Sequence, residues 1–408
     1  MTVFTSLENL WYAPQQSQDS IPENISPSGF FKTPMPIKQF VLVIVASGMF
    51  LFSACFGNHK PPPPVSGSGA PSVSTRAGKA AGSLADKAAV NKLTIGFSIA
   101  TDTFIIERWN KDMKVFSGAA QELGAKVIVQ LSAGGTREQI AQINYMVGQK
   151  IDLLVVIAND TEAISGVIRQ VREKGIPVIA YDRLITGVPI DAYISFDNRE
   201  VGRHFGRALT AVVPQGRYLV VNGSIVDSNS YTISAGLHEI IDPHIESGAL
   251  ELVREIWLDQ WSFDEALVKV GAIFEETIDF DAISCGNDQI ASAVIQLLSE
   301  RRLAGKVVVV GQDAELISCQ RIVEGVQLMT VYKPIGKLAV RAAQLAIAIA
   351  EKRTVPPDTF EDNASGVMIP SYIENSIAVF KENMDVVIRD GFHSREDVYR
   401  TVNFDTIP

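Results

Sequence analysis

The chain has 408 residues, a formal net charge of −10 at pH 7, 47% hydrophobic residues and 20% charged residues. This composition is typical of a folded protein with more than one hydrophobic core, and it excludes an intrinsically disordered chain. No basic patch offsets the excess of acidic residues, which argues against a nucleic-acid partner.

A short apolar run near the N-terminus predicts a leader. The run from Phe40 to Phe52 follows Lys38 and ends in Ser-Ala-Cys. A basic residue, a short apolar core and small residues are the parts of a secretory signal, and the run is shorter than the roughly 20 residues of a spanning helix. The ending FSAC resembles a bacterial lipoprotein signal, which implies a lipidated Cys55, although that family usually has an aliphatic residue in place of Phe52. An uncleaved signal anchor is the alternative.

The sequence on either side of this leader has no regular pattern. Residues 1–34 are polar and aperiodic, so we expect a non-translated or disordered extension, with translation starting at Met35. Residues 35–55 are then the signal peptide. Residues 56–90 are rich in Pro, Gly and Ser, which predicts a tether between the membrane and a folded body.

From Lys92 onward the pattern changes to strand, loop and helix, repeated. Such alternation predicts parallel sheets with right-handed crossovers and helices on both faces. The predicted strands are 93–99, 127–130, 153–157, 178–180, 193–195, 218–221, 252–256, 282–284 and 307–310, and the predicted helices are 105–123, 137–147, 162–173, 199–208, 234–241, 263–275, 290–300 and 335–351.

The alternation restarts once, which predicts an α/β protein of two doubly wound parallel-sheet lobes. We expect the long helix 335–351 to return to the first lobe, so that several chain crossings form a hinge. A hinge between two lobes favours ligand capture by closure. The expected lobes are 91–199 plus 333–365, and 200–332 plus 366–395.

The stretch 179–198 is the most informative part of the first lobe. It holds two short β-rich runs that end in polar residues, the first at Asp182 and Arg183 and the second at Asp197 and Asn198. Strand ends of this kind lie at the carboxyl edge of a sheet, where open α/β folds bind ligands. A guanidinium, carboxylates and an amide without metal-spaced Cys or His predict one wall of a polyol site. Asp197 and Asn198 are better explained as caps of the following helix.

Several longer stretches carry a family resemblance that covers about Lys92 to Glu396. IERWNKDMKVF, IAYDRLI, DAYISFDNREVG, VPQGRYLVVNGSIVDSN, GNDQIA, VVVVGQDAEL and LMTVYKPI resemble the periplasmic sugar-binding proteins of ABC importers, of the pentose/hexose type. The D-xylose-binding members are the most similar. The resemblance implies the type I periplasmic binding protein fold and a sugar held between two closing lobes.

The resemblance also implies a set of ligand-binding residues. Charged groups form strong hydrogen bonds to hydroxyls, and an indole can lie on the apolar face of a sugar ring. The implied polar contacts are Arg108, Arg183, Asp227, Asn229, Asn287, Asp313 and Lys333, and the implied ring-facing aromatics are Trp109 and Trp261.

Each of these residues also has a plainer explanation. Arg108 could be a surface charge, Trp109 could belong only to the core, and Arg183 could pair structurally with Asp182.

Two departures from the family bear on the identity of the sugar. Ser228 replaces the middle Asn of the family's Asp-Asn-Asn loop, and the stretch ATDTFIIERW differs from the family loop.

The remaining motifs do not indicate an enzyme. The five histidines show no paired metal spacing, and no nucleophile elbow, zinc-protease or phosphate-loop motif occurs. We expect no cofactor and no metal. Cys285 and Cys319 are expected to be buried free thiols, with a bridge between them as the alternative, because three cysteines do not make a disulfide framework.

The predicted function is therefore capture of a monosaccharide, with D-xylose favoured, by a monomeric, extracytoplasmic and membrane-anchored lipoprotein that delivers it to an ABC permease. The alternative is a sugar sensor that signals to a membrane kinase or chemoreceptor. A sugar-responsive repressor would need a basic helix-turn-helix at the N-terminus, where this chain has a leader and a Pro-rich linker.

Overall fold

The computed structural model describes residues 92–100 and 106–401. The chain divides into two units, 1–81 and 82–408, and all described residues belong to the second. The predictions for 1–34, for the signal peptide with Cys55 and for the tether 56–90 lie outside the described residues. Within them, no helix is long and apolar enough to cross a membrane.

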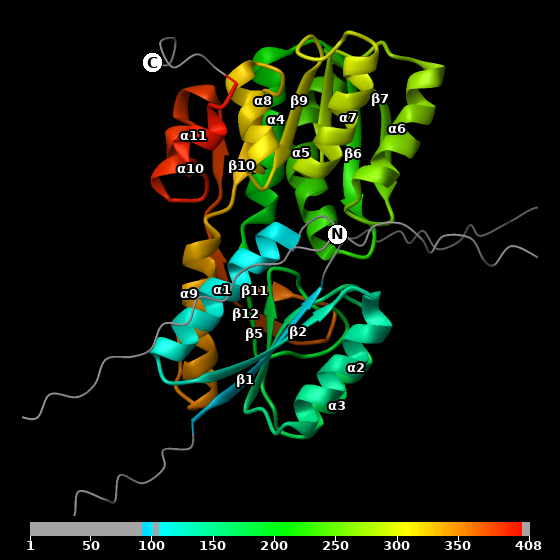
Figure 1. The fold of residues 1–408 in the computed structure, drawn as a ribbon. Helices are drawn as coiled ribbons and strands as arrows, with labels where there is room; N and C mark the ends of the chain where they lie inside the picture. The colour runs from blue at the N-terminus through cyan, green and yellow to red at the C-terminus, as the bar shows by residue number, and fades with distance from the viewer. Residues whose placement is uncertain (1–91, 101–105, 402–408) are drawn as a thin grey trace, which may run out of the picture. The chain divides into compact units, whose positions relative to one another are not determined.

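The first lobe is built on a seven-stranded sheet in the order β11-β12-β5-β4-β3-β1-β2. Its strands are β1 (Thr94–Ala100), β2 (Lys126–Ser132), β3 (Leu153–Ile157), β4 (Val178–Tyr181), β5 (Ala192–Phe196), β11 (Thr359–Asp362) and β12 (Met368–Glu374). Its helices are α1 (Ile106–Glu122), α2 (Gly135–Gly148), α3 (Ser165–Glu173) and α9 (Ile335–Ala350). Figure 1 shows these helices flanking the sheet.

Strand β3 explains why the first lobe has helices on both faces of its sheet. All five of its residues are buried, and successive side chains point to opposite faces. Val155 and Ile157 pack into a core that includes residues of α1 and α9, whereas Leu154 and Val156 pack into a second core with residues of α2 and α3. A continuous apolar strand of this kind is typical of a parallel sheet buried on both sides.

The second lobe is built on a six-stranded sheet in the order β13-β10-β9-β8-β6-β7. Its strands are β6 (Gly216–Ser224), β7 (Leu250–Leu258), β8 (Ala282–Cys285), β9 (Val308–Gln312), β10 (Met329–Tyr332) and β13 (Ile377–Val379). Its helices are α4 (Asn198–Val212), α5 (Ser228–Glu246), α6 (Phe263–Glu276), α7 (Asp288–Glu300), α8 (Leu316–Glu324), α10 (Asp385–Arg389) and α11 (Arg395–Val398). Cys285 and Cys319 are both buried and free.

The chain passes between the lobes three times, at β5–α4, β10–α9 and β12–β13. As expected, α9 returns to the first lobe, where it packs against α1. Asp197 accepts a hydrogen bond from the Glu200 amide at the start of α4, which confirms its expected role as a helix cap.

One expectation about the lobe boundaries is wrong. The chain does not enter the second lobe at residue 366, because β12 pairs in parallel with β5 and so completes the first sheet. Both sheets are mainly parallel, as expected, and only their edge strands β11 and β13 pair antiparallel, with β12 and β10 respectively. Short antiparallel edge strands of this kind are common on otherwise parallel sheets.

Candidate functional site

All nine residues expected to contact a ligand line one cavity, which we call the charged cavity. Parallel strands bring their carboxyl ends to one edge of a sheet. Strands β4, β8, β9 and β10 each end one or two residues before a polar residue of this set. The lining residues are Arg108, Trp109, Asp182, Arg183, Asp227, Asn229, Trp261, Asn287, Gln312, Asp313 and Lys333.

Two lining residues, Asp182 and Gln312, were absent from the expected set. Each directly precedes an expected residue at the end of a strand. This position had already assigned Asp182 to the predicted polyol wall, and it could have found Gln312 as well. Asp182 and Asp313 have positive φ values of 64° and 94°. Such values are uncommon for non-glycine residues and cluster at functional sites.

Helix starts supply much of the remaining lining. Arg108 and Trp109 lie in the first turn of α1, and the side chain of Asn287 caps α7 by accepting the Ile290 amide at 2.9 Å. Asn229 was expected in a loop, but α5 begins at Ser228, so Asn229 lies in the first helical turn. The chain therefore presents these polar groups on rigid elements.

Charged groups from the two lobes meet across the charged cavity. Arg108 of the first lobe donates from Nη2 to Asp182 and from Nη1 to Asp313 of the second lobe, the latter at 3.4 Å. The ammonium of Lys333, at the β10–α9 crossing, lies 3.9 Å from the Asp313 carboxylate. Although burial opposes ionisation, Arg108 and Lys333 lower the pKa of Asp182.

A second charge pair supports an aromatic wall. Arg183 Nε lies 2.8 Å from Asp227 Oδ2, and the same oxygen accepts the Trp261 indole N–H at 2.9 Å. Arg183 also donates to the carbonyl of Ala158 at 2.9 Å. These contacts fix the Arg183 guanidinium and the Trp261 ring relative to each other.

Trp261 can lie against the end of β6 because residue 223 is a glycine. A Cβ at Gly223 would meet the Trp261 ring at 2.1 Å, which is shorter than real contacts allow. On the other side of the site, the Trp109 ring has the Arg108 guanidinium carbon 4.4 Å from its centroid. Trp109 belongs to the hydrophobic core and also lines the charged cavity.

The charged cavity is small and contains polar atoms without partners. Its volume is about 20 Å³, roughly the space of one water molecule. Among the described residues, Arg108 Nε, Trp109 Nε1 and Gln312 Oε1 are buried without a hydrogen-bond partner. The enclosed space presents hydrogen-bond donors and acceptors together with positive and negative charges. Such a lining suits a small molecule with several hydroxyl groups. The described residues contain no group of His, Cys, Asp and Glu arranged to hold a metal ion.

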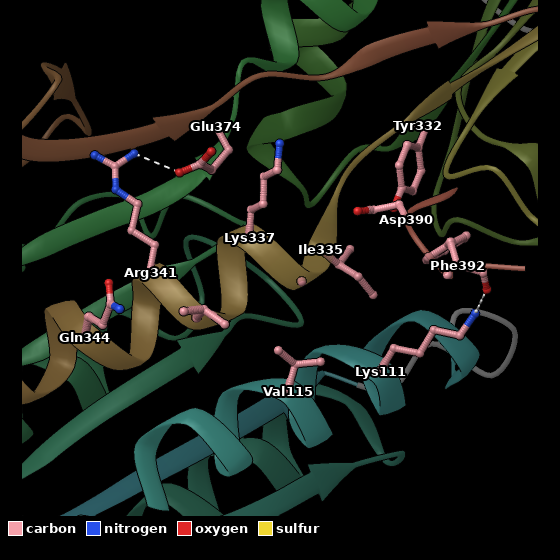
Figure 2. A pocket seen from close by; sticks show the side chains of 13 residues that line it. Lys111, Val115, Tyr332, Ile335, Lys337, Arg341, Gln344, Glu374, Asp390 and Phe392 are labelled. Carbon is pink, nitrogen blue, oxygen red and sulfur yellow. Dashed lines mark hydrogen bonds and ion pairs between the residues drawn. The ribbon is translucent and has the colours of Figure 1, made fainter. Parts of the chain in front are cut away.

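A larger hollow lies between α1, α9 and the C-terminal segment, and we call it the α1–α9 hollow. Its volume is about 880 Å³, and its lining includes Lys111, Ile335, Arg341, Asp390 and Phe392. Figure 2 shows the Lys111 ammonium directed at the Phe392 carbonyl, to which it donates at 3.1 Å, and Arg341 paired with Glu374.

Comparison with known proteins identifies relatives over most of the described chain. Residues 97–354 match the periplasmic binding protein domain family. The chain is 41% identical over 309 residues to the D-xylose-binding periplasmic protein of Haemophilus influenzae, a match that covers 75% of this chain and 92% of the relative. It is 39% identical over 306 residues to the D-xylose-binding periplasmic protein of Escherichia coli, covering 74% of this chain and 92% of the relative.

A solved structure has the same fold. It is an ABC transporter solute-binding protein from Clostridium phytofermentans with bound β-D-glucose, 24% identical, with a TM-score of 0.68, and the match covers 75% of this chain and 99% of that one. The expected type I fold with two lobes is thereby confirmed. The named relatives are binding proteins, which confirms the expectation of a binding protein in place of an enzyme.

Proposed function

Because this chain belongs to the periplasmic binding protein family, we propose that its charged cavity binds a monosaccharide, with D-xylose as the expected sugar. Two relatives of about 40% identity, each covered over 92% of its length, are named for D-xylose. The observation that carries the proposal is the assembly of the nine expected residues, from both lobes, around one cavity.

Sugar binding would require the charged groups to exchange partners. The present cavity has roughly the space of one water, and its cations and carboxylates contact each other. Separation of the lobes would break the contacts of Asp313 with Arg108, because these residues come from opposite lobes. The sugar hydroxyls would then bond to these charged groups, and Trp109 and Trp261 would pack on the ring.

The test is a calorimetric titration of the purified protein with D-xylose, and then with ribose, arabinose, glucose and galactose, with tryptophan fluorescence as a second signal. Tight binding of D-xylose alone would support the full proposal. Binding of another monosaccharide would keep the site and change its specificity. If none of the five sugars bound, the proposed function would be wrong.

We also propose that the protein acts outside the cytoplasm, anchored by a lipid on Cys55, and delivers its sugar to an ABC permease. The apolar run before Cys55 and the Pro-rich sequence after it support an anchor and a tether. Mass spectrometry of the membrane fraction should find a lipidated Cys55 at the N-terminus, and mass spectrometry of the uncleaved precursor should find no residues from 1–34. A peptide from 1–34 would overturn the proposed start at Met35, and an unmodified Cys55 would overturn the anchor.

A further inference from the structure

A buried carboxylate lies directly behind the charged cavity, on the helix that presents Arg108. Asp112 follows Arg108 by one turn of α1 and has no exposed surface. It does not line the charged cavity. Its Oδ1 accepts a hydrogen bond from the hydroxyl of Tyr181 at the end of β4, so one side of the carboxylate is fixed by the sheet.

The other carboxylate oxygen faces Arg108 but does not bond to it. Arg108 Nε and Asp112 Oδ2 lie 3.8 Å apart, which is too long for a hydrogen bond. Within the described part of the chain both atoms are buried and neither has a hydrogen-bond partner. The terminal nitrogens of Arg108 bond to Asp182 and Asp313, which holds the guanidinium forward in the cavity.

In this arrangement a buried donor, Arg108 Nε, and a buried acceptor, Asp112 Oδ2, lie up to about 1 Å too far apart to form a hydrogen bond. A buried N–H and a buried carboxylate oxygen without partners are unfavourable, so a modest shift of Arg108 toward Asp112 would satisfy both. A ligand that takes over the contacts of Arg108 with Asp182 and Asp313 would permit that shift.

We infer that Asp112 is a positioning residue, which accepts the Nε–H of Arg108 and holds the guanidinium in its sugar-binding orientation once a sugar has replaced the contacts with Asp182 and Asp313. This inference rests on the proposed function, because it concerns how the same cavity receives its ligand. Asp112 acts through Arg108 and does not itself touch the sugar.

The inference predicts a proton linked to sugar binding. The groups that face Asp112 are Arg108 on its own helix, Tyr181 and Asp182 at the end of β4, and Asp313 from the second lobe. Burial raises the pKa of Asp112 to about 7, although Arg108 and the Tyr181 hydroxyl oppose the rise. A direct bond from Arg108 favours the ionised form and would lower this pKa.

The direction of the pH effect follows from the lower pKa of Asp112 in the sugar-bound state than in the free state. The sugar-bound state holds the proton of Asp112 less tightly than the free state, so binding releases protons. Affinity should therefore rise with pH between about 5 and 8, by at most about tenfold per pH unit for a single proton. Calorimetry at pH 7 in two buffers of different ionisation enthalpy would count the protons released.

Substitution of Asp112 separates positioning from a merely structural role. At pH 8, Asp112→Asn should weaken sugar binding about tenfold or more, because a hydrogen bond to a charged group is lost, and should remove both the pH dependence and the proton release. The melting temperature without sugar should not fall, since the native carboxylate is only partly satisfied. Asp191→Asn is the matched control, because Asp191 pairs with Arg172 in the same lobe away from the cavity.

A double substitution tests whether Asp112 acts through Arg108. Arg108→Lys keeps the charge and removes Nε, so adding Asp112→Asn to it should cost less than twofold further affinity. Full additivity of the two effects would overturn the inference. The inference would also be overturned if the sugar affinity of the unaltered protein did not change between pH 5 and pH 8. This measurement does not depend on any variant folding correctly. Absence of sugar binding by the unaltered protein would overturn the proposed function, and this inference with it.

Discussion

Helix α1 borders two hollows of different character. Arg108 and Trp109 line the charged cavity, and Lys111 and Val115 line the α1–α9 hollow. The charged cavity has a volume of about 20 Å³ and the α1–α9 hollow about 880 Å³. The smaller of the two nevertheless has the chemistry of a binding site.

The difference lies in how the polar groups of each hollow are satisfied. In the α1–α9 hollow the charged groups bond to partly exposed neighbours, as Arg341 does to Glu374 and Asp358. In the charged cavity, buried charges pair across the lobes, and two buried atoms, Arg108 Nε and Gln312 Oε1, have no hydrogen-bond partner among the described residues. Unsatisfied buried polar atoms are energetically costly. They therefore indicate a site that a ligand would complete, and they are a better indicator of a binding site than cavity size is.

The strongest test of this contrast is Asp313→Asn, which removes a charge that Arg108 and Lys333 share. Asn tolerates the positive φ at this position, so the backbone should be retained. We expect sugar affinity to fall by about 100-fold, since loss of one partner from a buried charge pair costs about 2–5 kcal/mol. Calorimetry measures the change, with the exposed Asp279→Asn as the control; equal affinity in both variants would remove Asp313 from the site.

A smaller effect is expected from Gly223→Ala, which tests the aromatic wall. The added Cβ would overlap the Trp261 ring and force it out of position. Sugar affinity should fall about tenfold, because an aromatic contact is worth about 0.5–1.5 kcal/mol, and tryptophan fluorescence should change before any sugar is added. Gly271→Ala in α6 is the matched control, since its nearest neighbour would lie 3.8 Å away. An unchanged affinity would show that Trp261 does not contact the ligand.

The smallest effect is expected in the α1–α9 hollow. Arg341→Ala breaks two partly exposed ion pairs, so the free energy of unfolding should fall by about 1 kcal/mol or less. Sugar affinity should stay within twofold of the native value. Chemical denaturation and calorimetry measure the two quantities. A large loss of affinity would contradict the comparison, because it would couple the α1–α9 hollow to the charged cavity.

Much of the architecture could be predicted from local patterns. The uninterrupted apolar run of β3 and the helical spacing of α1 placed both elements to within one residue of their observed bounds, whereas the predicted helix 234–241 covers only part of α5. Polar residues directly after strands, such as Arg183 and Asp313, were expected at one edge and lie around one cavity. Their contact with a ligand stays a prediction.

The features that were missed depend on contacts between distant parts of the chain. Nothing near β12 in the sequence indicates that it pairs with β5, so the lobe boundary was misplaced. Asp112 has the spacing of an ordinary helical ion pair with Arg108. Its importance comes from the Tyr181 hydroxyl and from complete burial, which only the packing of α1 on the sheet produces.

The position of β12 also has a consequence for the order in which the protein can fold. It lies between β11 and β5, so residue 371 becomes the neighbour of residue 193. As the chain is synthesised, β1 to β5 emerge well before β12, and the edge of β5 stays unpaired until the entire second-lobe segment between them has been made. The first lobe is therefore the first to be synthesised, but its sheet can be completed only late. An open strand edge is prone to pairing with other chains, and contacts so far apart in sequence form slowly. This topology delays completion of the native fold until almost the whole chain is available, an order of events that would suit a chain exported before it folds.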